Sequence, residues 1–280
     1  MVRIITDSAA DFEPFELEKL KISCVPLKVM IGQEEYEENI NLEKARFFEL
    51  LASTGETPKT SQPSPKHLAD FFEEAKAAGD EAIYISISSA ISGTYQTACM
   101  TREDAECDDC YVFDSLNATG GQRMLVEYAV RLRDEGKGAK EIIAAMESIR
   151  DKVVLFACMD TLEYLYRGGR ISQTVYKLGS MAQVKPIIRI SEAGKVEVPA
   201  KAMGMRKGMD QLAKRLEAQK PDMNHKIYVM YTADRSNGQA LAQKLTAMGY
   251  AIPEEQIIPV GAAIGSHIGP NACGIVYVAE

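Results

Sequence analysis

Patterns typical of β-strands alternate with patterns typical of helices through the first half of this 280-residue chain. This alternation constrains the fold more than any other feature of the sequence. Short apolar runs at residues 2–5, 82–87 and 111–113 have the composition of buried strands, and a helix is expected after each run, near residues 15–20, after residues 88–95 and over residues 120–134. Strands interleaved with helices favour a parallel sheet that is covered on both faces. We therefore expect an α/β/α domain over residues 1–150.

Two connecting regions of the first half carry signals of their own. Residues 25–29 alternate between apolar and polar side chains like a short strand, and residues 31–34 predict a hairpin turn after it. Residues 57–65 are rich in Thr, Ser and Pro, which is typical of a loop.

The second half has a different pattern. Gly194 marks a hairpin turn within residues 190–195, and helical spacing appears near residues 205–218 and 238–248. The strand patterns number six: 153–158, 186–190, 195–199, 227–231, 257–260 and 274–278. These features predict a mixed six-stranded sheet with helices on one face, in a second domain over residues 151–280. The boundary between the domains is expected near Arg150.

Charge and composition exclude several classes of protein. The net charge of −8 repels nucleic acids and anionic membranes. No apolar run approaches the roughly 20 residues that a membrane helix needs, and the first residues do not have the pattern of a secretory signal. The six cysteines are scattered through the chain, so we interpret them as reduced thiols. These features predict a cytoplasmic protein without stable membrane insertion.

Motifs for metals and cofactors are also missing from the sequence. Cys107 and Cys110 form a solitary Cys-x-x-Cys pair, whereas a structural zinc site needs four ligands. The chain has neither a Walker A motif nor a dinucleotide-binding glycine pattern. We therefore expect no metal and no cofactor.

The strongest local signal for a binding site follows the strand pattern at residues 82–87. Ser92, Gly93 and Thr94 come directly after that strand and are expected to open a helix. Free backbone N–H groups at a helix start attract anions, the hydroxyls add donors, and glycine allows a ligand to approach the backbone. The alternative is that Ser92 or Thr94 only caps the helix.

Two further clusters combine polar side chains with residues that turn the chain. Thr60 and Ser61 lie in a proline-stiffened segment, where Ser64 and Pro65 are also suited to start a helix. Arg170 follows two glycines, a combination that can present a cation to an anion. The same glycines are equally suited to end a helix in the left-handed conformation, and both interpretations of them can hold together.

A fourth cluster places His267 in a glycine-rich stretch before the last strand, where we expect a loop. A histidine there can donate to a carboxylate or transfer a proton, although a lone loop histidine is more often structural. Ser92, His267 and either Asp7 or Asp114 supply the residue types of a catalytic triad, but no nucleophile-elbow pattern is present. The two other histidines, His67 and His225, are expected at the surface.

The order of these clusters resembles the DegV family of bacterial fatty-acid-binding proteins. The matching pieces span nearly the whole chain and are Thr6-Asp7-Ser8, Thr60-Ser61-Gln62-Pro63, Ser92-Gly93-Thr94-Tyr95, Leu162-Glu163-Tyr164-Leu165, Gly168-Gly169-Arg170-Ile171-Ser172, Lys185-Pro186 and Gly265-Ser266-His267-Ile268-Gly269-Pro270. The resemblance implies two α/β domains with one long-chain fatty acid buried between them. It also implies a binding protein that is not itself an enzyme.

The resemblance assigns the fatty-acid carboxylate to a set of residues from both domains: Thr60, Ser61, Ser92, Gly93, Thr94, Arg170 and His267. It further implies that the bound acid is presented to a separate ATP-dependent fatty acid kinase, which forms an acyl phosphate for phospholipid synthesis. Family members often carry a basic residue where this chain has Met203, and that residue is tied to kinase engagement. The alternatives are a phosphotransferase or hydrolase that uses His267 and Ser92, and a regulatory module that holds lipid only for stability.

Overall fold

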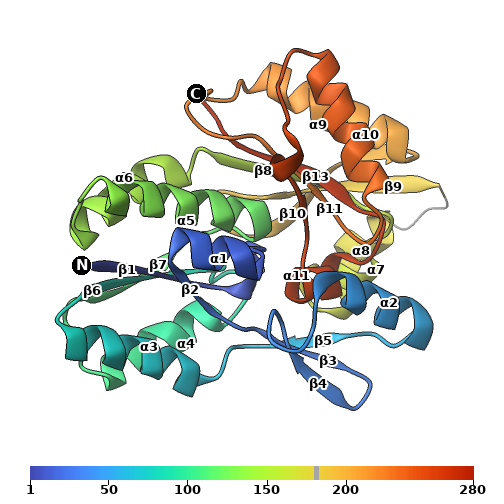
Figure 1. Cartoon of the computed structure of the whole chain (residues 1–280). Helices are drawn as coiled ribbons and strands as arrows, with labels where there is room; N and C mark the ends of the chain where they lie inside the picture. Colours follow the sequence, from blue (N-terminus) through green and yellow to red (C-terminus); the bar gives the residue numbers. More distant parts are fainter. Residues whose placement is uncertain (180–182) are drawn as a thin grey trace.

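The computed structural model describes residues 1–179 and 183–280, and these residues form two large sheets and one small sheet (Figure 1). The first large sheet is built from the N-terminal half of the chain and the second from the C-terminal half. Each of the two has helices packed on it. The architecture is therefore mixed α/β, as the alternating patterns predict.

The first sheet is parallel throughout and has the strand order β2–β1–β6–β7. Its strands are β1 (Val2–Asp7), β2 (Ile22–Val25), β6 (Glu81–Ser86) and β7 (Cys110–Asp114). Its helices are α1 (Pro14–Leu20), α3 (Pro65–Ala78), α4 (Thr94–Asp104), α5 (Thr119–Asp134) and α6 (Ala139–Arg150). Neighbouring residues on a strand face opposite sides, so Ile83 packs with Leu125 and Ile142, whereas Tyr84 packs with Phe72 and Ala98. The predicted parallel sheet with helices on both faces is confirmed.

The second sheet is mixed and has the order β10–β9–β8–β13–β11–β12. Its strands are β8 (Val153–Cys158), β9 (Val184–Ile190), β10 (Val196–Met203), β11 (Tyr228–Tyr231), β12 (Ile257–Pro259) and β13 (Cys273–Val278). Within the described strands of this sheet, only the pairing of β11 with β12 is parallel. Helices α9 (Met205–Ala218) and α10 (Ser236–Ala247) cover one face through Leu212 and Leu241. The six predicted strands are all present, and the β9–β10 hairpin turns at Gly194 with a φ of +72°.

Helix α5 joins the two sheets because it packs against both of them (Figure 1). Leu125 and Val126 of this helix share one core with Ile83 of the parallel sheet and with Val276 of the mixed sheet. Gly120 permits the approach, because a Cβ there would lie 2.9 Å from the Met230 sulfur. The two halves of the chain therefore share a continuous apolar core.

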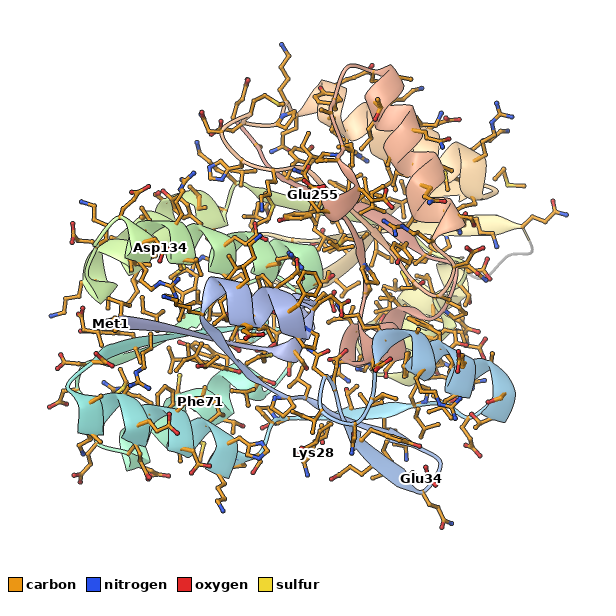
Figure 2. All side chains as sticks on the ribbon, viewed as in Figure 1. Met1, Lys28, Glu34, Phe71, Asp134 and Glu255 are labelled. Atoms are coloured by element: carbon orange, nitrogen blue, oxygen red, sulfur yellow. A yellow bond between two sulfur atoms is a disulfide. The ribbon has the colours of Figure 1, made fainter. Side chains whose placement is uncertain are left out.

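The small sheet has the order β4–β3–β5 and lies beside the parallel sheet. Its strands are β3 (Lys28–Ile31), β4 (Glu34–Glu37) and β5 (Lys59–Ser61), and α2 (Lys44–Thr54) connects β4 to β5. The predicted hairpin is present, with Gly32 in its turn and Glu34 pointing into solvent beyond it (Figure 2). Two predictions were wrong here. Residues 25–29 divide between β2 and β3, and the predicted loop contains β5, which pairs with β3 across a long stretch of sequence.

The remaining elements are short: η1 (Ser8–Ala10), α7 (Glu163–Arg167), α8 (Gln173–Gly179), η2 (Glu254–Gln256) and α11 (Ala262–Ile268). Helix α11 carries His267, so the prediction of a glycine-rich loop there was wrong. Gly265 serves close packing instead of a turn, because a Cβ there would lie 2.9 Å from ring atoms of Phe47 and Phe48. Gly269 then ends the helix with a φ of +70°.

The cysteines and the two remaining histidines bring further corrections. Cys107 and Cys110 form a disulfide, so the prediction of six reduced thiols was wrong for this pair. The turn before β7 brings their Cα atoms to 5.2 Å, within the range that a disulfide spans. His67 and His225 are half-buried and not fully exposed.

No helix in the described ranges has both the length and the apolar character to cross a membrane.

Candidate functional site

A cavity of about 580 Å³ is lined by residues from both halves of the chain. This volume lies within the roughly 300–1,000 Å³ of small-molecule sites. Most of its wall is aliphatic, from residues that include Leu27, Ile87, Ile91, Leu155, Leu165, Ile188, Ile190, Val196, Val260, Ile264 and Ile268. The polar residues of the wall include Thr60, Ser61, Gln62, Ser92, Thr97, Arg170 and His267. The cavity is therefore suited to a ligand that is mostly apolar.

His267 and Thr60 meet at the cavity although 207 residues separate them in sequence. His267 Nε2 lies 2.7 Å from the Thr60 hydroxyl oxygen, which joins α11 to β5. Burial, with the Arg170 charge as a smaller cause, lowers the pKa of His267 to about 3. The imidazole is therefore neutral at physiological pH, and it acts as a hydrogen-bonding group rather than as a cation.

Gly168 supports the His267 ring from the other side. A Cβ on Gly168 would lie 2.1 Å from His267 Nδ1, so only glycine leaves room for the ring. Nδ1 is buried and has no hydrogen-bond partner among residues 1–179 and 183–280. Gly169 follows with a φ of +74°, so this pair both ends α7 and accommodates the histidine.

Arg170 brings a positive charge to the same region. Its Nε donates to the Ile91 carbonyl at 3.0 Å and a terminal nitrogen donates to the Gly168 carbonyl at 2.6 Å. In the described part of the chain no carboxylate forms an ion pair with it. Burial lowers the pKa of this guanidinium, but arginine remains charged at neutral pH. A half-buried cation without a counter-charge is suited to bind an anion.

The segment before α4 contributes the hydroxyl of Ser92 to the cavity wall. Ser92 lines the cavity, and its hydroxyl oxygen lies 2.8 Å from that of Thr94. Thr94 is buried and does not itself line the cavity, so it fixes the Ser92 side chain from behind. Ser92 also accepts from the Thr94 amide at 3.3 Å, but the N-cap of α4 is Gly93, so the prediction that Ser92 or Thr94 caps this helix was wrong. Gly93 also lines the cavity.

Two polar residues of this wall were missed by the sequence-based site prediction. Gln62 packs directly on Gly93, because a Cβ on that glycine would lie 2.1 Å from Gln62 Nε2. Thr97 donates a hydrogen bond to Gln62 Oε1. Thr97 lies one turn after Gly93 in α4, a spacing that could have indicated a shared face.

The contacts do not assemble a catalytic triad. The Asp7 carboxylate accepts from Tyr84, Gln122 and two backbone amides, and that of Asp114 accepts from the amides of residues 89 and 116. Thr60 is the only hydrogen-bond partner of the His267 ring within the described residues, and no carboxylate orients the ring. The geometry therefore favours binding over acyl or phosphoryl transfer by His267 and Ser92.

An aliphatic cavity with neutral hydroxyls, a neutral imidazole and a guanidinium without an ion pair among the described residues is suited to an amphipathic anion. The family model that matches this chain is described as uncharacterised protein, DegV family, and it covers residues 1–280. A DegV domain-containing protein of Clostridium perfringens is 31% identical over 284 residues, covering 99% of this chain and 97% of that protein. The chain belongs to the DegV family.

Solved structures of the family share this fold over nearly the whole chain. A DegV family protein from Thermus thermophilus, described by its fatty acid binding, has a TM-score of 0.89 and 29% identity, covering 100% of this chain and 99% of that one. DegV from Bacillus subtilis, described as a fatty acid binding protein, has a TM-score of 0.84 and 27% identity with the same coverage. Fatty-acid binding is thus a property of related proteins with this fold.

Proposed function

We propose that this protein binds one long-chain fatty acid between its domains, residues 1–150 and 151–280, and that it is a carrier and not an enzyme. The observation that carries this proposal is the mostly aliphatic cavity of about 580 Å³ with Arg170 unpaired at its wall. Burial of an acyl chain contributes roughly 0.8 kcal/mol per CH₂. Two further buried carbons should therefore lower Kd by about 15-fold until the cavity is filled.

In this proposal the carboxylate lies against Arg170, His267, Thr60, Ser61 and the Ser92–Gly93 segment, with Thr94 in support. An ionised carboxylate that leaves water without partners costs several kcal/mol, so a charged donor and hydroxyls are needed where the head group rests. A guanidinium and neutral donors meet that need without proton transfer. The resemblance of the clusters to the family supports the same assignment.

Competition binding with a matched ligand series tests the function. Saturated acids of increasing length, and the methyl ester of the tightest one, are competed against a fluorescent fatty acid. We expect affinity to rise with length, and the ester to bind at least about 10-fold more weakly because it lacks the charge. Equal binding of acid and ester would contradict the head-group assignment. Failure of every acid to bind would contradict the function.

We further propose that the bound acid is presented to a separate ATP-dependent fatty acid kinase, a role that would place the carrier in the cytoplasm. Met203 ends β10 and is 56% exposed, where the family resemblance leads us to expect a basic residue. Lys201, Arg206 and Lys207 are exposed around it. Acyl-phosphate formation by such a kinase, measured with this protein and with its Met203→Arg variant, tests the step. A higher rate for the variant is expected, and no product with either protein would contradict the proposal.

A further inference from the structure

Two buried carboxyl groups converge on the start of α11, the helix that carries His267. The Asp11 carboxylate accepts from the Gly261 amide at 2.8 Å, and Glu38 accepts from the amides of Ala262 and Ala263. Both acidic residues are only 1% exposed. A Cβ on Gly261 would lie 2.0 Å from Glu38 Oε1 and 3.0 Å from Asp11 Oδ1, so the two groups approach the same point.

These contacts reach the wall of the ligand cavity. Thr119 lines the cavity, and its hydroxyl donates a hydrogen bond to the Asp11 carboxylate. Ala263 accompanies His267 in the cavity wall, and its amide is held by Glu38. The two carboxyl groups therefore hold the start of α11, the helix that carries His267.

The charges around the pair do not balance two carboxylates. Lys44 is 7% exposed, and its ammonium donates to the Asp11 carbonyl at 2.7 Å, but it also pairs with Glu13 at 3.0 Å. Arg123 donates to the same carbonyl and pairs with Glu16 and Glu127, so its charge is already shared. The nearby Cys24 thiol carries no charge, because burial raises its pKa. Glu38 Oε2 makes no hydrogen bond in the described part of the chain.

We propose that Asp11 and Glu38 share one proton and act as positioning residues that hold α11, and through it His267, in the binding arrangement. Loss of this proton places two negative charges beside each other in a buried site, which favours displacement of the helix start. Retention of the acid is then weaker above neutral pH than below it. This inference rests on the proposed fatty-acid function.

The electrostatics of the pair agree with the geometry. Burial raises the pKa of Glu38 to about 7, with the Asp11 charge adding to the rise and the Ser8 hydroxyl and Lys44 opposing it. Burial likewise raises the pKa of Asp11 to about 6, against the charges of Lys44 and Arg123. The pair therefore loses its shared proton near neutrality, whereas His267 remains neutral throughout that range.

Oleate binding between pH 6 and pH 8.5 tests the inference with the wild-type protein, Glu38→Gln and the control Glu37→Gln. Glu38→Gln makes the pair permanently neutral at one position, whereas Glu37→Gln removes the same charge from the neighbouring, partly exposed residue. We expect the wild-type Kd to rise about 10-fold with pH, which corresponds to a one-unit difference in pKa between the free and bound forms. The control should follow the wild type, and Glu38→Gln should lose the dependence. The same pH dependence in Glu38→Gln would overturn the inference.

The His267 ring proton resonance gives a second readout that needs no ligand, and the three histidines allow assignment by substitution. It should shift with a midpoint near pH 7 in the wild type and remain constant in Glu38→Gln, or in Asp11→Asn if the first variant does not fold. An unchanged resonance in the wild type would overturn the inference. Absence of oleate binding at every pH would instead contradict the proposed function, while the resonance would still test the pair.

Discussion

The Gly168→Ala variant tests the position of the His267 ring without changing any polar side chain of the site. Gly168 has a φ of −74°, a conformation that alanine adopts without strain. The new Cβ would lie 2.1 Å from His267 Nδ1 and 3.1 Å from the Tyr164 carbonyl oxygen, so the imidazole must move. The Tyr164 carbonyl needs to shift by only a few tenths of an ångström, whereas the His267 ring loses its position.

The expected cost follows from the hydrogen bonds that depend on that position. Displacement breaks the 2.7 Å contact between His267 and Thr60, and with it the donor that the ring offers to a bound carboxylate. The contact with Thr60 exists without ligand, so its loss lowers the stability of the fold and not the binding free energy. The lost hydrogen bond to the charged carboxylate is worth roughly 1.5–3 kcal/mol. This corresponds to an increase of about 10- to 150-fold in Kd.

Competition binding of a long-chain fatty acid measures the change, and thermal unfolding of the ligand-free protein measures folding. Gly138→Ala is the matched control, because Gly138 has a φ of −76° and the nearest atom to a Cβ there is 3.6 Å away. We expect the control to bind like the wild type. Wild-type affinity in a folded Gly168→Ala protein would refute the role assigned to His267.

Three further predictions concern charge, hydroxyl and pH. Arg170→Gln should raise the Kd of the acid by about 10- to 150-fold, since a hydrogen bond to a charged group is worth roughly 1.5–3 kcal/mol; a similar loss for the methyl ester would argue against a charge effect. Thr60→Val should weaken binding about 5-fold while Thr60→Ser retains it, and equal affinities of the two variants would exclude the hydroxyl. Because the pKa of Glu38 rises from 4.5 in the unfolded chain to about 7 on folding, its proton stabilises the folded state at low pH. Urea unfolding should therefore show the wild type losing stability relative to Glu38→Gln between about pH 4.5 and pH 7, and a constant difference would contradict this.

Local sequence patterns were sufficient for the large elements of the fold. The six strands of the mixed sheet have continuous or alternating apolar runs, and Gly194 marks the turn between two of them. Strand β5 was missed because it is three residues long and exists only through its pairing with β3. Helix α6 was not predicted, although residues 139–150 have apolar residues at helical spacing.

The site was predicted less completely, because its geometry depends on tertiary contacts. The hydroxyl, arginine and histidine clusters were visible as motifs, but the direction of each side chain was not. Thr94 supports Ser92 without lining the cavity, and only the turn at the start of α4 determines which of the two faces inward. Glu38 lies in an acidic run that is typical of a solvated surface, yet the chain buries it against α11.

Mass spectrometry of the purified protein under native and denaturing conditions tests the central claim most directly. The native spectrum should contain a mass increment of one long-chain fatty acid that disappears on denaturation, because the proposed complex is noncovalent. The increment should also be reduced in Arg170→Gln. A protein that carries no lipid and takes up none when fatty acid is added would contradict the account.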